Sequence, residues 1–471
     1  MVQFYQHQTE AFDSITSAIS KNKKSIKGRV IIPTGGGKTM IEASIIDWQR
    51  KHNRKNRIHL ILAPRIVLVN QLIEEYRKTS GYTAYRVIAF HSGAYEPDHE
   101  EIIWKENNTT QISDVHESLE NAKKGKQHLV VFSTYHSMFK LSGIEFDTII
   151  ADESQYLVSE NFGDAWKALA GRVKLCFTAT EKHTASDNGR GLNNFSLFGN
   201  RLFEVSASTL IERGIIVSPR LHVMYGETKV EKDSVISEVI ELSREQMKLT
   251  VGELGFSKIL FAMKGTDDVK TVVDNIAKIQ QEFPGYDICT ITSKSKARIN
   301  GMVIRREDFL EELKARKNCL IFHYDILSEG IDIPGITGVG ILRNLGLAKL
   351  LQTIGRAVRL YRENGVNIKT QAWVSVSVIN GDEDDKERVK NIIQCIREGG
   401  FDITAENIFE TGKPRHEGDE EGVEDAYGKT KNNFADLFLV NILHEIEQSN
   451  FWNKIVSAKT DDEKIAAIFG E

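Results

Sequence analysis

A glycine-rich loop between an apolar run and a segment of helical periodicity limits what this chain can fold into more than any other feature. The stretch RVIIPTGGGKTMIEA occupies positions 29–43. Three glycines in a row leave room for backbone N–H groups to surround phosphate oxygens, and the N-terminus of the following helix adds partial positive charge. A lysine and a hydroxyl come next, and in such loops they neutralise the terminal phosphates and hold Mg²⁺. The predicted phosphate-binding residues are Thr34, Gly35, Gly36, Gly37, Lys38 and Thr39, of which Thr39 is also a predicted magnesium ligand.

The strict form of this pattern, G-x-x-x-x-G-K-[ST], has glycine where this chain has Ile32. A glycine-rich turn without a ligand is the alternative interpretation. An acidic pair argues against it, because Asp152 and Glu153 directly follow the apolar run at 148–151. Beside a phosphate loop, the first carboxylate would hold Mg²⁺ and the second would polarise the attacking water. Taken alone, two carboxylates at a strand end are equally consistent with solvated loop charge.

Short apolar runs typical of strands recur along the chain and alternate with longer amphipathic stretches. This alternation predicts parallel sheets covered by helices on both faces. The series runs twice, with a break near Ile215–Pro219, so we predict two doubly wound α/β domains at 1–217 and 218–400. The runs that define them are 29–32, 60–63, 129–132, 148–151 and 175–178, then 259–262, 288–291, 320–324, 338–342 and 372–379.

The end of the chain has a different character. Residues 410–431 are polar and rich in glycine and acid, which predicts a linker or loop. Asn433 is positioned to cap a helix whose apolar residues share a face. We therefore predict that 401–471 forms an acidic linker and a small helical appendage, a candidate docking site for a protein partner. The polar stretch 96–127 is predicted to be a loop-and-helix excursion of the first domain.

The composition says more about where in the cell the protein is expected than about what it does. With 61 Lys+Arg against 66 Asp+Glu, the net charge of −5 does not advertise a nucleic-acid binder, although a cleft can be locally basic. No run of about 18 apolar residues occurs, which predicts no membrane span, and the N-terminus has no secretory pattern. The four cysteines stand far apart, which suits a reducing cytoplasm.

The phosphate loop and the acidic pair resemble the motifs of the superfamily 2 helicases, and the resemblance extends from Gln8 to Arg359. It implies two RecA-like domains, ATP as nucleotide, and Gln8 as the adenine contact. It also implies that Arg65 and Thr134 contact the nucleic-acid backbone, and that Thr178 and Thr180 couple hydrolysis to strand movement. The second motif departs from relatives such as restriction-enzyme motor subunits, which have histidine where this chain has Gln155. A glutamine carries no charge, but it can still form bridging hydrogen bonds, so we expect activity to survive.

In the second domain the resemblance rests on three segments. Ser293 is weakly similar to a hydroxyl that lies near the nucleic-acid backbone. The stretch DILSEGIDIPG at 325–335 resembles the fifth motif and implies that Gly330 and Asp332 face the nucleotide. The stretch QTIGRAVR at 352–359 resembles the sixth and implies that Arg356 and Arg359 are arginine fingers, which stabilise the charge of phosphoryl transfer. Spaced three apart, they are predicted to share a helical face.

These resemblances predict an ATP-dependent motor in which the nucleotide lies between two domains that close and open around it. The spacing of the fifth and sixth motifs is more similar to DNA motors than to RNA remodellers. The first hypothesis is therefore a DNA helicase of replication, recombination or branch migration, in the cytoplasm of a bacterium or a phage-infected host. The alternatives are a double-strand DNA translocase of a restriction or defence complex, an RNA helicase, and an inactive nucleic-acid clamp.

Overall fold

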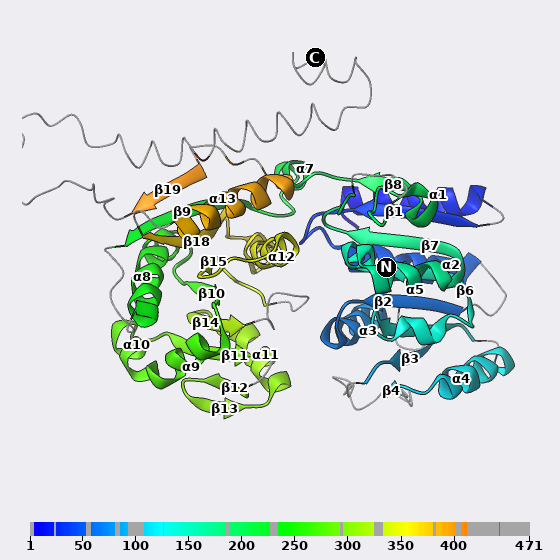
Figure 1. The fold of residues 1–471 in the computed structure, drawn as a ribbon, viewed down its shortest axis with the longest axis horizontal. Helices are drawn as coiled ribbons and strands as arrows, with labels where there is room; N and C mark the ends of the chain where they lie inside the picture. The colour runs from blue at the N-terminus through cyan, green and yellow to red at the C-terminus, as the bar shows by residue number, and fades with distance from the viewer. Residues whose placement is uncertain are drawn as a thin grey trace, which may run out of the picture. The chain divides into compact units, whose positions relative to one another are not determined.

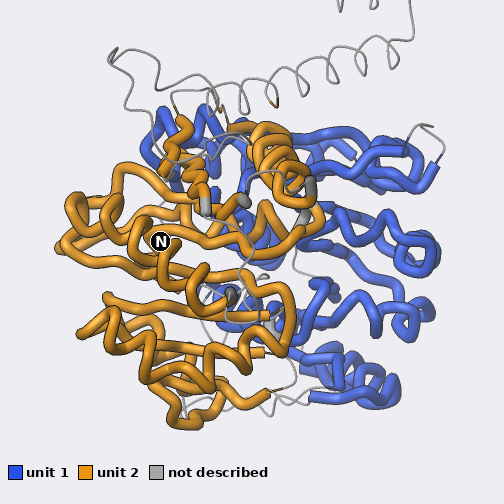
Figure 2. Tube along the Cα trace, turned by 60° about the vertical axis from the view of Figure 1, so that its left-hand side comes forward, with its two compact units in different colours: residues 1–216, 329–332 blue, residues 217–328, 333–471 orange. Residues whose placement is uncertain are grey.

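The protein is described here from a computed structural model. The described residues are 4–22, 25–52, 58–80, 85–92, 108–125, 127–184, 189–226, 234–292, 295–324, 333–379, 383–401, 403, 407–411 and 442. The chain divides into two compact units, which Figure 2 colours separately. Unit 1 comprises 1–216 and 329–332, and unit 2 comprises 217–328 and 333–471. Each unit is built on one mainly parallel sheet with helices packed against it (Figure 1), which confirms the predicted fold class.

The sheet of unit 1 has eight strands in the order β4-β3-β5-β2-β6-β7-β1-β8, and all its pairings are parallel. Its strands are β1 (Ile26–Ile31), β2 (Ile58–Ala63), β3 (Arg86–Phe90), β4 (Asn108–Thr109), β5 (Leu129–Thr134), β6 (Glu145–Ala151), β7 (Ala170–Thr178) and β8 (Asn200–Glu204). The helices are α1 (Gln6–Lys21), α2 (Lys38–His52), α3 (Ile66–Ser80), α4 (Ile112–Lys124), α5 (Glu160–Ala168), α6 (Phe195–Phe198) and α7 (Ala207–Glu212), with 3₁₀ turns η1 (Met138–Leu141) and η2 (Ser154–Val158).

Continuous apolar sequence explains why the central strands of unit 1 lie inside. Every residue of β5 is buried, as expected for a strand covered on both faces. Lys174 is a buried exception in β7, and its Nζ donates hydrogen bonds to the carbonyl oxygens of Trp166 at 2.6 Å and Leu169 at 3.0 Å. The same ammonium lies 4.2 Å from the centre of the Trp166 ring. Its charge is therefore offset by carbonyl oxygens and by an aromatic face.

The sheet of unit 2 has nine strands in the order β13-β12-β11-β14-β10-β15-β18-β9-β19. The pairings are parallel except those of the β12–β13 hairpin. Its strands are β9 (Ser218–Gly226), β10 (Lys258–Ala262), β11 (Asp287–Thr292), β12 (Ala297–Ile299), β13 (Met302–Ile304), β14 (Cys319–Tyr324), β15 (Gly338–Ile341), β18 (Gln371–Ile379) and β19 (Ile408–Thr411). The helices are α8 (Ser234–Leu254), α9 (Thr266–Asp274), α10 (Ile276–Glu282), α11 (Arg306–Ala315), α12 (Leu347–Ala357) and α13 (Glu383–Glu398), and β16 (Arg362–Glu363) pairs with β17 (Val366–Asn367).

The structure adds elements that the apolar runs did not predict. Strands β3, β8 and β9 and the hairpin β12–β13, which were not among those runs, lie at or near sheet edges. Strand β19 pairs with β9 and so extends the second sheet into the stretch predicted as linker and appendage. The rest of that stretch, apart from single residues, lies outside the described residues. Within the described part of the chain, no helix is long and apolar enough to cross a membrane.

Candidate active site

The glycine loop follows β1 and leads into α2, whose first residue is Lys38. Gly35 and Gly37 have φ angles of 88° and 76°, a left-handed backbone conformation that favours glycine. A Cβ atom on Gly37 would also lie only 2.3 Å from Nε2 of Gln8. The N–H groups in the first turn of a helix have no intrahelical acceptor, so a loop of this shape before α2 can receive phosphate oxygens.

Two side chains of α1 hold the loop from one side. Nε2 of His7 lies 2.7 Å from the carbonyl oxygen of Gly36, and burial lowers the pKa of His7, which suits a neutral ring donating to that carbonyl. The Gln8 amide donates to the carbonyl oxygen of Gly37 at 3.3 Å, and its Oε1 accepts from the backbone N–H of Tyr5 at 2.9 Å. Gln8, predicted to contact adenine, is therefore placed against the phosphate loop. No role is predicted for His7 from the sequence, although it stands beside Gln8 in the same motif.

The acidic pair lies at the carboxyl end of β6, the edge of a parallel sheet at which ligands bind. Asp152 is buried, its N–H donates to the carbonyl oxygen of Leu62 at 2.9 Å, and its own carbonyl accepts from the hydroxyl of Tyr135 at 2.6 Å. Glu153 has a left-handed φ of 52°, and its Oε1 lies 3.6 Å from Nζ of Lys38. The second motif is thus joined to the phosphate loop by an ion pair.

A third carboxylate, Glu42 of α2, is fully buried near this pair. The Tyr76 hydroxyl lies 3.5 Å from its Oε2, and its Oε1 has no hydrogen-bond partner among the described residues. Burial, and next the charge of Asp152, raises the pKa of Glu42 well above its ordinary value. Burial likewise raises the pKa of Asp152, with a further contribution from Glu153, although Lys38 opposes both shifts.

Three carboxylates, Glu42, Asp152 and Glu153, lie near one cation, Lys38, so the site can accommodate a further positive charge. Asp152 and the hydroxyl of Thr39 offer hard oxygen donors, the kind of ligand that Mg²⁺ prefers. A divalent cation beside Asp152 would offset charge that Lys38 alone does not balance. The residues present therefore fit Mg²⁺, with Asp152 and Thr39 as the groups that would hold it. Glu42 was missed in the sequence because a lone glutamate inside a helix gives no motif.

A short hydrogen-bonded relay leads from the acidic pair to the end of β7. Nε2 of Gln155 donates to Oε2 of Glu153 at 3.0 Å, and the hydroxyl of Thr178 lies 2.7 Å from Oε1 of Gln155. That hydroxyl also lies 2.6 Å from the carbonyl oxygen of Thr180 and accepts from the Thr180 N–H at 3.1 Å. The structure thus brings together the residues predicted for catalysis and coupling in unit 1, from Lys38 through Glu153 and Gln155 to Thr178.

The predicted backbone contacts of unit 1 stand apart from this relay. Arg65 is half-buried just before α3. Thr134 is buried at the end of β5, and its hydroxyl donates to Oγ of Ser137 at 3.2 Å. The next residue, Tyr135, contacts the carbonyl of Asp152 and so links this motif to the acidic pair. Their roles toward nucleic acid stay predictions.

In unit 2, one expectation about the arginines was wrong. Arg356 lies buried in the last turn of α12, but the helix ends at Ala357 and Arg359 lies beyond its C-cap, Val358. The two arginines therefore do not share a helical face. Beyond the helix end, the buried Lys369 donates from Nζ to the carbonyl oxygens of Ile336, Ala357 and Arg359. The carbonyls of Ala357 and Arg359, which a longer helix would have used, are thereby satisfied without a further helical turn. Three other predicted residues, Ser293, Gly330 and Asp332, lie outside the described residues.

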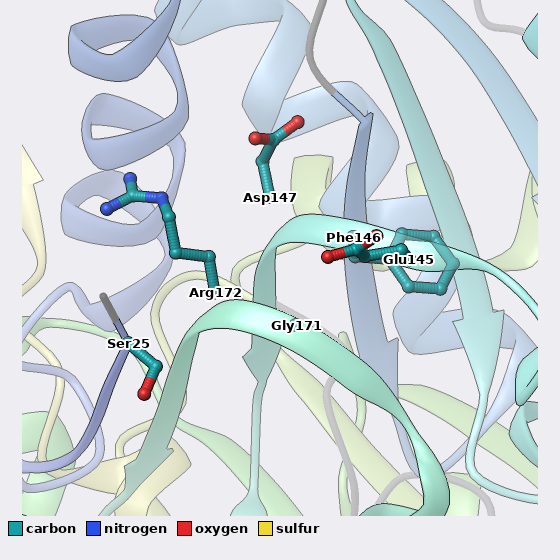
Figure 3. A pocket seen from close by; sticks show the side chains of 6 residues that line it. All are labelled: Ser25, Glu145, Phe146, Asp147, Gly171 and Arg172. Carbon is teal, nitrogen blue, oxygen red and sulfur yellow. The ribbon is translucent and has the colours of Figure 1, made fainter. Parts of the chain in front are cut away.

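A hollow of about 480 Å³ lies at the opposite end of the unit 1 sheet. Figure 3 shows its lining side chains, among them Asp147 of β6 and Arg172 of β7, with Ser25 just before β1. These residues come from the amino-terminal parts of three neighbouring strands, whereas Lys38 and Asp152 follow carboxyl ends. Ligands of parallel α/β sheets bind outside the carboxyl ends, so this hollow is separate from the candidate active site.

Comparisons with known proteins concern the fold and the first part of the chain. Residues 1–183 match the family described as "Type III restriction enzyme, res subunit". No curated protein sequence matches the chain. The fold is similar to that of the ATP-dependent Type ISP restriction-modification enzyme LlaBIII bound to DNA, with a TM-score of 0.64 and 16% identity over 87% of this chain and 32% of that one.

Two further structures share the fold. A nuclease-deletion mutant of the Type ISP enzyme LlaGI in complex with a DNA substrate mimic gives a TM-score of 0.58 and 17% identity over 84% of this chain and 29% of that chain. The DEAD-box helicase Mss116 bound to single-stranded RNA and UDP-BeF gives a TM-score of 0.53 and 15% identity over 99% of this chain and 83% of that chain. The two α/β units thus form the tandem RecA-like architecture of helicase cores.

Residues 1–183 are a superfamily 2 helicase-like domain of the restriction-subunit kind. The whole chain spans 32% and 29% of the two restriction-modification enzymes that it matches.

Proposed function

We propose that this chain is an ATP-hydrolysing motor that moves along double-stranded DNA, as the translocase part of a restriction or defence system. The observation that carries the proposal is the connected set of Lys38, Glu153, Gln155 and Thr178, because it joins a phosphate loop to an acidic pair and a coupling segment. The family match and the folds of the two restriction-modification enzymes favour a restriction-type translocase over the replication or recombination helicase that the sequence first suggested.

In the proposed mechanism, residues of this chain bind the phosphates of ATP and position the attacking water. The loop at 34–39 surrounds the phosphates of ATP, and Lys38 neutralises the charge at their end. Glu153 orients and polarises the attacking water, while the amide of Gln155 fixes one of its carboxylate oxygens. Bound Mg²⁺ supplies positive charge to the transferred phosphoryl group. Phosphoryl transfer depends mainly on positioning and on electrostatic stabilisation, which these groups provide.

The test is steady-state ATP hydrolysis at one salt concentration with linear duplex DNA, single-stranded DNA and single-stranded RNA. Duplex DNA should stimulate turnover most, and Glu153→Gln should abolish hydrolysis while leaving ATP binding intact. Glu160→Gln is the matched control, because Glu160 is an exposed carboxylate at the start of α5. Unchanged turnover in Glu153→Gln would remove the catalytic assignment, since the control shows what loss of a surface carboxylate does.

Movement is tested separately from hydrolysis. A triplex-forming strand on linear duplex DNA should be displaced when ATP is present, whereas a simple forked duplex should remain paired. Separation of the fork without triplex displacement would restore the helicase hypothesis.

The RNA helicase stays the second candidate because a DEAD-box helicase bound to single-stranded RNA shares the fold over nearly the whole chain. In the same hydrolysis experiment, the strongest stimulation by single-stranded RNA would favour it.

The predicted role of Arg356 is tested by Arg356→Ala, which should lower kcat more than it raises KM if Arg356 acts on the transition state. A change in KM alone would place Arg356 outside the catalytic machinery.

A further inference from the structure

The β12–β13 hairpin lies at the edge of the unit 2 sheet (Figure 1), and its sequence is basic. The twelve residues at 295–306 contain four cations, Lys296, Arg298, Arg305 and Arg306, and no acidic residue. These four cations give the segment a charge of +4, whereas the whole chain carries −5. A local basic patch on an acidic protein indicates attraction to a polyanion.

The hairpin positions these cations around a hollow. Asn300 and Gly301 have left-handed φ angles of 50° and 84°, as a tight two-residue hairpin turn requires. The hairpin therefore returns the chain so that Lys296 and Arg305, at its two ends, line one hollow of about 510 Å³ together with Ser295 and Arg306. Lys296 is exposed, and so is the Arg305 side chain.

The hollow lies by the carboxyl end of a parallel strand. Nη2 of Arg306 donates to the carbonyl oxygen of Thr292, the last residue of β11, at 2.9 Å. Arg305 pairs with Asp308 through two contacts of 2.8 and 3.0 Å, but this pair is exposed, and exposed ion pairs contribute little energy. A phosphate group can therefore compete for Arg305 at low energetic cost.

Apolar side chains next to the cations supply an independent observation. Met302 is 72% exposed, the highest value among the exposed large hydrophobic residues of the described part, and Val303 beside it is 51% exposed. An exposed apolar pair on an edge strand is a liability unless a partner covers it. A nucleic-acid strand offers phosphates to the cations and the less polar sugar faces to such side chains.

We propose that the β12–β13 hairpin and the start of α11 form a nucleic-acid backbone-binding site in which Lys296 and Arg305 contact phosphates. The inference rests on the proposed function and adds to it a specific contact surface in unit 2. Contacts of this kind read no sequence, so the site would hold any strand of suitable charge.

The experiment compares the full-length double variant Lys296→Ala/Arg305→Ala with wild type. Binding of labelled duplex DNA, single-stranded DNA and single-stranded RNA is measured at several salt concentrations. Each lost phosphate contact removes about 0.7 to 0.9 from the slope of log affinity against log salt, so the double variant should lose about 1.4 to 1.8. Affinity at low salt should fall at least about tenfold. ATP hydrolysis without nucleic acid should stay at the wild-type rate, because neither residue belongs to the ATP site.

The matched control is Arg244→Ala/Lys248→Ala, which removes two exposed cations of the same unit. Both lie on α8 and are paired with carboxylates, as Arg305 is. The control should keep the wild-type slope, and Lys296→Arg/Arg305→Lys, which preserves both charges, should restore binding. An unchanged slope in the alanine variant, or an equal loss in the control, would overturn the inference while leaving the proposed function in place. Wild-type protein that binds no nucleic acid would overturn both.

Discussion

The side-chain oxygen of Gln155 lies 2.7 Å from the hydroxyl of Thr178, so a glutamine in the acidic motif contacts the threonine that ends β7. Both side chains are buried. The same glutamine donates to Glu153, and the same hydroxyl accepts from the N–H of Thr180. A movement of Glu153 can therefore be transmitted through the side chains of Gln155 and Thr178 to the segment that follows β7. No charged group is needed at position 155.

Thr178→Val tests this relay. Valine has nearly the same shape but no hydroxyl, so Gln155 loses a donor and the N–H of Thr180 loses an acceptor. We expect the free energy of unfolding to fall by about 1–3 kcal/mol, because buried polar groups are left unsatisfied. The ratio of nucleic-acid-stimulated to basal ATP turnover should fall more than ATP affinity does. Thr271→Val is the control, because Thr271 lies on α9 of unit 2 and its hydroxyl donates to the carbonyl oxygen of Asp267 in the same helix. An equal loss in both variants would contradict the relay.

Gly37→Ala should damage the phosphate loop in two ways. A left-handed φ of 76° costs an alanine about 1 kcal/mol, and its Cβ would lie 2.3 Å from Nε2 of Gln8. We expect at least a tenfold loss of ATP affinity, measured by titration with a fluorescent nucleotide. Gly252→Ala is the control, because nothing lies within 4 Å of its Cβ and it stands in helix α8. That variant should bind ATP normally and gain about 0.5–1 kcal/mol of stability. Normal binding by Gly37→Ala would show that the loop tolerates a side chain.

Lys369→Met should disturb the positions of Arg356 and Arg359 without weakening nucleotide binding. Lys369 holds three backbone carbonyls around the end of α12, and its loss leaves them unsatisfied, which costs about 2 kcal/mol. Without this anchor, Arg356 and Arg359 should shift. We therefore expect kcat for ATP to fall toward that of Arg356→Ala while ATP affinity changes little. Lys248→Met, at an exposed lysine of α8, is the comparison. Wild-type kcat in a destabilised Lys369→Met protein would assign Lys369 a purely structural role.

The stability of unit 2 should depend on pH through His222. Its Nδ1 lies 3.1 Å from Oγ of Ser375 and its Nε2 lies 2.8 Å from Oγ1 of Thr411, and burial lowers the pKa of His222 from 6.5 to about 4. The unfolded chain takes up a proton as pH falls from 6.5, while the folded chain stays neutral until about 4. Stability is therefore lost progressively between these values, by up to roughly 3 kcal/mol.

Urea unfolding at pH 7.5 and pH 5 measures this loss. His222→Asn should be less stable than wild type at pH 7.5 but should lose less stability on acidification. His116→Asn, which changes an exposed histidine of α4, should retain the wild-type difference. The same loss on acidification in His222→Asn and wild type would mean that other groups cause it.

The fold class could be predicted because fully buried parallel strands must be continuous apolar runs. Ten such runs locate the ten strands that form most of both sheets. Edge elements could not be found in this way, because β19 and the two strands of the β12–β13 hairpin are only partly buried and span only three or four residues each. Loop signals such as Asn300-Gly301 were present in the sequence, but without a neighbouring strong strand they give no clear hairpin.

The candidate site was predictable where spacing along the chain fixes geometry. The loop at 34–39 and the pair at 152–153 each lie within one segment, so their residue types are sufficient evidence. Contacts between distant segments were not predictable: Glu42 approaches Asp152 only because the sheet places α2 beside β6, and Lys369 reaches Arg359 across a hairpin. The end of α12 before Arg359 was also missed, since helical spacing alone does not show where a helix stops.

Strand β19 has a practical consequence for dissecting the protein. It comes after α13 and pairs with β9, and the hydroxyl of Thr411 is hydrogen-bonded to Nε2 of His222. A chain cut at residue 400, where the apolar periodicity ends, would leave the N–H and C=O groups of β9 open along one side. Open strand edges pair with other chains, so such a fragment should self-associate. A fragment that ends after residue 411 keeps that side closed and is the shorter form to express.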